Sequence, residues 1–345
     1  MGNNKKRILY IGNILSKHGF TPTNIETLTP QLSEEFSVIK VSDKKNKILR
    51  LLDICKAIIF NKSKLDLILI DTYSTSAFKF AQIAGELCMR FNIPYIAILH
   101  GGNLPQKIEK ANPKEKAFFT NAAALVAPSN FLYASFEKFG LKNLVYIPNN
   151  IDLSQYPFKQ RTQLKPNLYW VRSFHQIYNP VMAVDVLKII TEKYPDATLT
   201  MTGPDKDGTE ALVKARAAEL NLQNSLIVTG KLSRSEWHKL AATKDIFINT
   251  TNVDNTPISV VEAMALGLPV VSTNVGGLPY LLSNNIDARL VDPEKPALMA
   301  DAIIGLLNNP DQVQSLTQAA LNKVKAFDWS VVKKQWSGLI NDKAR

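Results

Sequence analysis

Two carboxylates, Asp254 and Glu262, stand at either end of a turn-to-helix segment within the stretch NVDNTPISVVEAMALGLPVVSTNVGGLP, residues 252–279. Glu262 falls within the first two turns of the expected helix, where its carboxylate can accept hydrogen bonds from vicinal hydroxyls such as those of a ribose. Asp254 lies in the turn before the helix, near where a sugar beyond a diphosphate would lie. The alternative is a capping turn with helix-dipole carboxylates, which does not require both residues at this separation.

The start of this helix is the expected anion site. Thr256 can cap a helix whose first residue is Pro257, and this pair is a strong signal for a helix start. The free backbone N–H groups of the first turn, from Ile258 and Ser259, favour an anion such as a diphosphate and are expected to point into a cleft between domains.

Other polar residues follow apolar runs that read as buried strands. His100 ends one such run and precedes two glycines, which let backbone approach a ligand; the alternative is a structural histidine. Arg172 ends another run, where its planar fork suits a phosphate, unless it forms a salt bridge between domains. Gly203 closes a third strand. Asp205 and Asp207 resemble a metal-binding D-x-D, but the proline and glycine around them favour a solvated turn.

Apolar runs alternate with helix-length segments throughout the chain, which indicates two α/β domains with parallel sheets in tandem, each doubly wound and Rossmann-like. A polar, proline-bounded stretch at 153–166 is the expected linker. We therefore expect an N-terminal domain at 1–152, a C-terminal domain at 167–328, and a closing helix at 329–345 that packs back on the first domain. In such sheets ligands bind beyond the carboxyl ends of the strands.

Composition and motifs exclude several classes. With 345 residues, 46% hydrophobic and 21% charged, the chain has an ordinary globular composition. No apolar run reaches the roughly 18 residues of a membrane span, and the start lacks a signal-peptide cleavage site, so a cytoplasmic protein is expected. Gly12 and Gly19 follow the first strand without a G-x-G-x-x-G, and neither a P-loop nor a G-x-S-x-G elbow occurs. Cys55 and Cys88 are expected to be buried thiols, and the histidines show no metal spacing.

The positive charge is concentrated in the first half of the chain. The net charge is +11, and residues 1–150 carry 20 Lys and Arg against 11 Asp and Glu. Lysines flank the apolar segment ILRLLDICKAIIF, residues 48–60, which fits either an amphipathic helix on an anionic membrane or, our preferred interpretation, a core-packing helix with a solvated lysine face. Nucleic-acid binding is not expected, because no aromatic-basic interleaving accompanies the charge.

The segment EAMALGLPVV that begins at Glu262, the following GGLP, and the Asp254-x7-Glu262 spacing together resemble the retaining glycosyltransferases of the B-type fold (GT-B), specifically glycosyltransferase family 4. The resemblance runs from about Asn149 to residue 328 through WVRSF, MTGP, VTGKLS and FINTT, and it is loose in the first domain. It implies two Rossmann-like domains that face a central cleft, with no metal cofactor.

The resemblance also implies roles for single residues. Glu262 would hold the ribose of a nucleotide sugar, while the backbone from Thr256 to Ser259, with Arg172, would hold the diphosphate and the donor sugar. His100 would face the transferred sugar, and the 12–19 loop would close over the phosphates. The implied catalytic residues are His100, Asp254 and Arg172, and the implied donor-binding residues are Glu262, Thr256, Pro257, Ile258, Ser259, Gly203, Lys231, Leu232, Gly12 and Gly19, with Lys231 and Leu232 lining the base.

Some positions depart from the family pattern. Asp254 stands where Glu is usual, and Asn255 stands where Gly is common. Ile177 and Tyr178 occupy the places where a lysine normally joins the arginine on the diphosphate, so Arg172 carries that charge alone unless His175 or Lys231 assists.

The expected function is transfer of a sugar from a nucleotide-diphosphate donor to a hydroxyl of a glycan or lipid-linked acceptor, with retained configuration. The expected setting is bacterial surface polysaccharide synthesis (capsule, lipopolysaccharide or exopolysaccharide), in the cytoplasm or at the inner face of the membrane. The alternatives are a nucleotide-sugar epimerase of the same fold and a non-catalytic nucleotide-sugar-binding scaffold.

Overall fold

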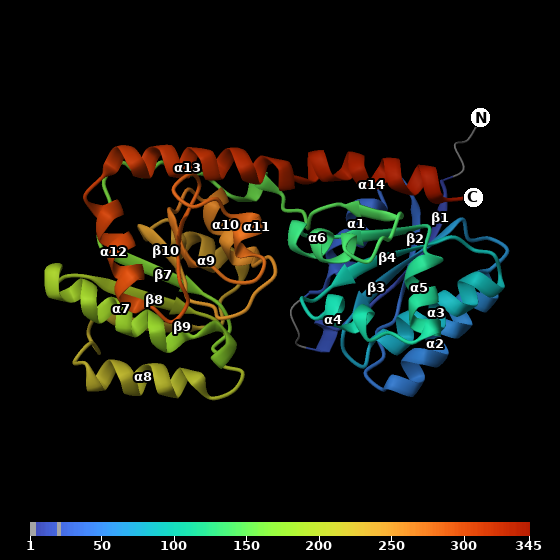
Figure 1. Ribbon diagram of the computed structural model, residues 1–345, viewed down its shortest axis with the longest axis horizontal. Helices are drawn as coiled ribbons and strands as arrows, with labels where there is room; N and C mark the ends of the chain where they lie inside the picture. The colour runs from blue at the N-terminus through green and yellow to red at the C-terminus, as the bar shows by residue number, and fades with distance from the viewer. Residues whose placement is uncertain (1–4, 19–21) are drawn as a thin grey trace. The chain divides into compact units, whose positions relative to one another are not determined.

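The computed structural model describes residues 5–18 and 22–345, which form two compact units. Unit 1 comprises Met1–Asn149 and Ser330–Arg345, and unit 2 comprises Asn150–Trp329 (Figure 1). Each unit is built on one six-stranded parallel sheet with helices on both faces, so the predicted α/β fold with two Rossmann-like sheets is confirmed.

The sheet of unit 1 has the strand order β2-β1-β3-β4-β5-β6. Its strands are Ile-, Leu- and Val-rich and largely buried, as expected for a sheet that is covered on both sides. Their bounds are β1 Arg7–Ile11, β2 Ser37–Val41, β3 Leu67–Tyr73, β4 Tyr95–His100, β5 Ala124–Ala127 and β6 Leu144–Tyr146.

One main apolar core of unit 1 lies between this sheet and helices that include α2, α3, α5 and α6. Helix α1 packs on the opposite face, where its Asn24 bonds the hydroxyl of Tyr10 at 2.8 Å. The helices are α1 Asn24–Leu32, α2 Lys47–Asn61, α3 Phe78–Arg90, α4 Leu104–Glu109, α5 Pro113–Thr120, α6 Asn130–Glu137 and α14 Trp329–Lys343.

The sheet of unit 2 has the strand order β12-β11-β10-β7-β8-β9. One core contains α7, α8 and α12, and a second contains α9, α10 and the end of α13, so both faces of the sheet are covered. The strands are β7 Asn167–Val171, β8 Thr198–Thr202, β9 Leu226–Gly230, β10 Ile246–Asn249, β11 Val270–Thr273 and β12 Arg289–Val291. The helices are α7 Pro180–Lys193, α8 Thr209–Glu219, α9 Arg234–Ala241, α10 Ile258–Ala265, α11 Leu278–Leu281, α12 Pro296–Leu307 and α13 Pro310–Val324.

Each strand order contains a point where the chain reverses direction across the sheet. In unit 1 this switch point lies between β1 and β3, and in unit 2 it lies between β7 and β10. Ligands of doubly wound sheets bind outside the carboxyl ends of the strands at such points. The residues that follow these four strands are therefore the first place to look for a site.

The expected linker at 153–166 is an anchored part of unit 2. It is irregular apart from a 3-10 turn at Leu153–Gln155. However, Tyr156 is buried, and the buried Arg161 donates to the carbonyls of Lys244, Leu266 and Ala241. Satisfying three carbonyls with one guanidinium fixes this stretch against α9 and α10.

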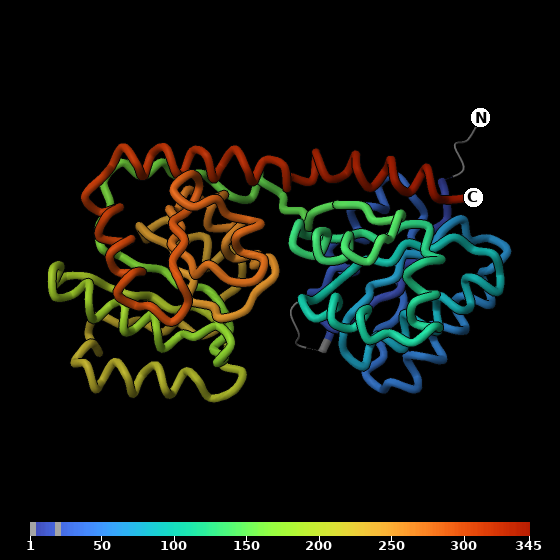
Figure 2. Tube along the Cα trace, viewed as in Figure 1, coloured from blue at the N-terminus to red at the C-terminus, as the bar shows by residue number. Residues whose placement is uncertain are grey.

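The last helix groups with unit 1. Val332, Trp336 and Ile340 of α14 are buried, and Lys333 pairs with Glu34 at 2.6 Å. In Figure 2 the red end of the trace lies beside the blue beginning of the chain, where Lys6 donates to the carbonyl of Asn341.

The prediction for α2 is wrong in its outer face. The helix buries Arg50, Ile54 and Ile58, as a core-packing helix should, but large apolar side chains rather than lysines alone cover the opposite side. Within the described residues, no helix combines the length and the apolar character needed to cross a membrane.

Candidate functional site

Arg172 and Asp254 form an ion pair beyond the switch point of unit 2. Arg172 directly follows β7, and Asp254 lies in the loop after β10, the neighbouring strand. The guanidinium Nη2 bonds Oδ2 of Asp254, whose Oδ1 accepts from the backbone N–H of Asn255 at 2.8 Å. Burial raises the pKa of the Asp254 carboxyl, and Arg172 and the Asn255 N–H offset part of that rise.

The glycine pair Gly276–Gly277 fixes the loop that carries Asp254. The N–H of Gly277 donates to the carbonyl of Asp254 at 2.9 Å. A β-carbon at Gly277 would lie 1.8 Å from the carbonyl oxygen of Asn255, and one at Gly276 would lie 2.2 Å from that of Asp254. The two glycines are therefore needed because two backbones meet here.

A second close approach fixes Arg172. A β-carbon at Gly203, after β8, would lie 1.7 Å from the carbonyl oxygen of Arg172. The guanidinium carbon lies 4.1 Å from the centroid of the Tyr178 ring, a cation–π contact at the place where the family pattern has a lysine. The Nε of Arg172 is buried, and no described residue accepts its hydrogen.

The start of α10 differs from the prediction by one residue. Pro257 is the N-cap, with extended backbone, and Thr256 makes no capping bond but lies half-buried in the loop before it. The helix begins at Ile258 because the carbonyl of Pro257 accepts the first intrahelical bond, from Val260 at 3.1 Å. No described residue accepts from the backbone N–H of Ile258 or Ser259, and the buried Oγ of Ser259 also has no partner among them.

Glu262 is a buried carboxylate inside α10, with 5% of its surface exposed. Its Oε1 accepts from the hydroxyl of Tyr156 at 2.7 Å and lies 3.3 Å from Nε of Arg234. Burial raises the pKa of Glu262, and the hydrogen bond from Tyr156 and the charge of Arg234 oppose this rise. Burial also raises the pKa of the Tyr156 hydroxyl, as does the neighbouring carboxylate.

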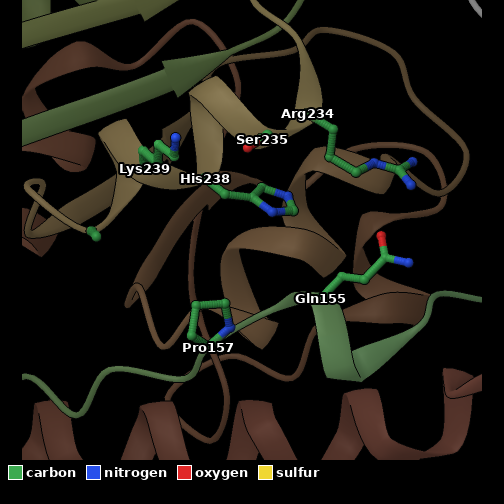
Figure 3. A pocket seen from close by; sticks show the side chains of 7 residues that line it. Gln155, Pro157, Arg234, Ser235, His238 and Lys239 are labelled. Atoms are coloured by element: carbon green, nitrogen blue, oxygen red, sulfur yellow. The ribbon is translucent and has the colours of Figure 1, made fainter.

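A cavity of about 590 Å³ lies beside this cluster, between α9 and the segment 155–157 (Figure 3). Arg234, which contacts Glu262, and His238 both line it, and the figure shows Arg234 extending from the start of α9. Desolvation lowers the pKa of His238, and Arg234 adds to the effect, so a neutral imidazole is favoured. Lys231 and Leu232 lie in the loop before α9, Lys231 exposed and Leu232 half-buried, and neither lines the cavity.

His100 belongs to a separate cluster at the carboxyl edge of the unit 1 sheet. Its Nε2 lies 2.9 Å from Oδ1 of Asp71, which also accepts from the hydroxyl of Tyr10 at 2.9 Å. The ring of Tyr73 stacks on His100 with centroids 4.9 Å apart. Burial and the Asp71 charge raise the pKa of both tyrosines, which keeps them neutral donors.

Gly12 follows β1 directly beside this cluster. A β-carbon there would lie 2.5 Å from Oδ2 of Asp71, an oxygen that has no partner among the described residues. Gly12 therefore leaves room for the Asp71 carboxylate at the switch point between β1 and β3. Gly19 lies outside the described residues.

The predicted residues thus fall into two groups, one on each unit. Three residues of these groups were not predicted from the sequence: Asp71, Tyr156 and Arg234. Asp71 could have been found from the sequence, because it ends the apolar run LDLILID and so lies near a strand end. Two residues later, Tyr73 pairs in register with His100. No sequence pattern indicated Tyr156 or Arg234, because their contacts with Glu262 join segments far apart in the chain.

Metal ligands do not cluster in the parts of the chain that are described. No group of three His, Cys, Asp or Glu there could hold a metal ion. Asp205 and Asp207 accept backbone bonds from Gly208 at 3.0 Å and from Gln176 at 2.9 Å, as residues of a turn do.

Most of unit 2 matches the model of a known protein family. Residues 157–323 match the model described as "Glycosyl transferases group 1". A D-inositol 3-phosphate glycosyltransferase of Corynebacterium glutamicum is 25% identical over 47% of this chain and 40% of its own length. A glycogen synthase of Mycobacterium tuberculosis is 26% identical over 56% of this chain and 47% of its own length. The matched regions span less than half the length of these relatives.

Among solved structures, Anabaena Alr3699/HepE in complex with UDP has the same fold. It superposes with a TM-score of 0.76 over 98% of this chain and all of its own, at 17% identity. The two parallel sheets are therefore those of a GT-B glycosyltransferase fold. Through residues 157–323, the chain is similar to the glycosyl transferases group 1 family.

Proposed function

We propose that the chain is a glycosyltransferase that moves a sugar from a nucleotide-diphosphate sugar to a hydroxyl of a glycan or lipid-linked acceptor, with retention of configuration and without a metal. One observation carries the proposal. At the switch point of the unit 2 sheet, within the family segment, Arg172, the start of α10 and Glu262 combine unused donors with a buried carboxylate.

The diphosphate would bind at the start of α10. The N–H groups of Ile258 and Ser259, the Ser259 hydroxyl and the Nε of Arg172 have no partner among the described residues, and they are donors that suit phosphate oxygens. Buried polar groups without partners are rare in folded proteins, so several at one edge of a sheet indicate a ligand. Because Asp254 already neutralises part of the Arg172 charge, the helix N–H groups would bear more of the phosphate interaction here than in relatives with an added lysine.

The ribose would bind Glu262. Tyr156 and Arg234 both contact Oε1, which leaves the lone pairs of Oε2 for the two ribose hydroxyls. Tyr156 would act as a positioning residue that holds the carboxylate at the correct rotation. Lys231 and Leu232 would lie along the base, and Gly203 would let the strand edge approach the donor.

In the reaction, the bond from the anomeric carbon to the diphosphate oxygen breaks and a bond to the acceptor oxygen forms on the same face of the sugar. The acceptor proton passes to the departing diphosphate. The transition state resembles an oxocarbenium ion, so catalysis consists mainly in stabilising the charge that grows on the leaving oxygens, through α10 and Arg172. His100, held by Asp71, would contact the transferred sugar, and Gly12 and Gly19 would belong to the loop over the phosphates.

The acceptor and the cellular setting belong to the same proposal. The relatives include proteins named as differently as D-inositol 3-phosphate glycosyltransferase and glycogen synthase, so the similarity alone does not select an acceptor. The excess of lysine in the first half of the chain supports an anionic or lipid-linked acceptor, as in surface polysaccharide synthesis on the cytoplasmic side of a bacterial membrane.

The test is donor binding and transfer by two variants. We expect UDP or GDP, and the matching nucleotide sugar, to raise the melting temperature of the wild type. Arg172→Ala and Glu262→Ala should each lower transfer by at least 100-fold, while Arg289→Ala, in β12, should retain it. Wild-type turnover in both variants would refute the residue roles.

Two alternatives predict different products. An epimerase would convert the donor sugar without an acceptor. A binding scaffold would retain the nucleotide-induced shift in melting temperature but release no diphosphate with any acceptor.

A further inference from the structure

The outer face of α2 is apolar and exposed. This face consists of Ile48, Leu49, Leu52, Ile59 and Phe60, which are 71%, 55%, 60%, 44% and 73% exposed. These are five of the large hydrophobic residues that solvent reaches, and they lie on a single 15-residue helix. Single exposed apolar residues need no explanation, but a contiguous set of this size marks an interaction surface.

Helix geometry places these five residues together. At about 100° per residue, they occupy the side of α2 opposite the buried Arg50, Ile54 and Ile58, of which the two isoleucines belong to the unit 1 core. Figure 1 shows α2 beside α3 at the edge of unit 1. The helix is therefore apolar on both sides: one side covers the sheet, and no described residue covers the other.

Lysines flank α2 in the sequence. Seven lysines against two aspartates lie between residues 40 and 64, with one group before the helix and another after it. Lys56 sits within the face itself, with its ammonium 5.8 Å from the centroid of the Phe60 ring. A flexible lysine stem can lie along apolar surface while its ammonium group reaches a polar layer.

We propose that the outer face of α2 docks on an anionic membrane surface. A helix with large apolar side chains on its free face and lysines around it can lie in the plane of the lipid interface. The apolar side chains enter the acyl boundary, and the ammonium groups bind headgroup phosphates. Acidic phospholipid is the partner whose charge and apolar depth complement both features.

A second copy of the chain fits this surface less well. A two-fold contact would bring each face against itself, so the same lysines would meet across the interface. That contact would gain the apolar burial but place like charges together, whereas an anionic bilayer gains from both. The inference is independent of sugar transfer, because it concerns only the binding surface of unit 1.

The experiment is co-sedimentation of the whole chain with vesicles of phosphatidylcholine alone or with 40 mol% phosphatidylglycerol. We expect binding to the anionic vesicles only. The triple variant Leu49→Gln, Leu52→Gln, Phe60→Gln should bind at least tenfold more weakly. Neutralising Lys45, Lys47 and Lys56 to Gln should weaken binding about 100-fold, since each lysine near an anionic surface contributes a factor of about five.

Matched controls separate the surface from general charge and hydrophobicity. Leu212→Gln with Ile286→Gln removes equally exposed apolar residues of unit 2, and Lys114→Gln, Lys116→Gln, Lys138→Gln removes three other exposed lysines of unit 1. Both controls should bind nearly as the wild type does. The nucleotide-induced shift in melting temperature, measured on every variant, reports on the donor site separately.

Three results would overturn the proposal: no binding of the wild type to anionic vesicles, equal binding by the α2 variants and the controls, or a wild-type dimer in solution that the apolar triple variant converts to monomer. The last result would assign the outer face to a second copy.

Discussion

At the scale of single residues, the candidate site holds two carboxylates whose ionised form is disfavoured by burial. Glu262 and Asp254 are both buried carboxylates whose pKa is raised by burial, and the partners of each offset only part of that effect. A protein that needed only stability would place neutral groups here. Their burial fits the proposed roles, in which Glu262 binds ribose hydroxyls and Asp254 positions Arg172.

Glu262→Gln should therefore change the pH dependence of stability. Because the folded-state pKa of Glu262 is above 4.5, its ordinary value, the folded protein binds this proton more tightly than the unfolded chain does. The contribution of Glu262 to the free energy of unfolding therefore falls as pH rises from the pKa of Glu262 in the unfolded chain to its pKa in the folded protein. At higher pH the contribution stays low. Glutamine does not titrate, so the variant does not lose this stability as pH rises, and its amide oxygen can still accept the hydrogen bond from Tyr156. The melting temperature of the variant relative to the wild type should therefore increase from pH 4 to pH 7.

Thermal melts across that pH range check this prediction. The exposed Glu192→Gln serves as the control and should leave the melting temperature nearly unchanged throughout, since surface substitutions rarely exceed about 0.5 kcal/mol. A difference for Glu262→Gln that shrinks as pH rises would show that ionised Glu262 stabilises the fold. The same variant should also lose affinity for UDP.

At the scale of elements, loops after parallel strands form the site, and glycines set their spacing. The loop from β10 to α10 and the turn from β11 to α11 touch backbone to backbone at Gly276 and Gly277. The Arg172 loop meets β8 in the same way at Gly203. Such contacts fix the positions of the functional side chains more tightly than side-chain packing could.

Gly277→Ala should destabilise unit 2 by about 2–3 kcal/mol, because its methyl group would overlap the carbonyl of Asn255 and neither backbone can move away freely. The displaced loop carries Asp254, so UDP affinity should fall as well. Urea unfolding and nucleotide titration measure the two effects.

The control is Gly305→Ala in α12. Nothing lies within 4 Å of a β-carbon at that position, so the helix should gain about 0.5–1 kcal/mol and UDP binding should not change. If both variants behaved alike, the close approach at Gly277 would have no energetic consequence.

At the scale of the whole molecule, the chain returns to its first unit at the end. Residues 330–345 group with unit 1, although they follow unit 2 in the sequence. The return is anchored by apolar side chains of α14 and by ion pairs from Lys333 to Glu34 and Glu35. Unit 1 is therefore incomplete without residues 330–345.

Trp336→Ala should lower the stability of unit 1 by about 3–5 kcal/mol, since this side chain is 3% exposed. Hydrogen exchange should accelerate in β1 and α1, while peptides of β7 to β12 keep their protection. Val331→Ala, at a position 42% exposed on the same helix, should change neither. Faster exchange in unit 2 with the tryptophan variant would show that α14 also supports that unit.

The sequence alone predicted most elements, because their signals are local. The apolar runs that were predicted to end at His100, Arg172 and Gly203 are the strands β4, β7 and β8, each of which ends at that residue or just before it. The short helices α4 and α11 have six and four residues and follow glycine turns, so neither carries enough apolar spacing to be predicted from the sequence. The one-residue error at Thr256 and Pro257 is of the size that helix boundaries generally show.

The sequence determined the two-sheet α/β fold, the similarity of residues 157–323 to glycosyl transferases group 1, and the strand ends at which site residues were expected. Each of these depends on the order and spacing of nearby residues. The tertiary structure decided which side chains meet: Asp254 with Arg172, Glu262 with Tyr156 and Arg234, and His100 with Asp71. It also decided that α2 turns apolar residues outward. Contacts between segments far apart in the chain, and the choice of which helix face is buried, depend on how the elements pack, and no local pattern encodes that.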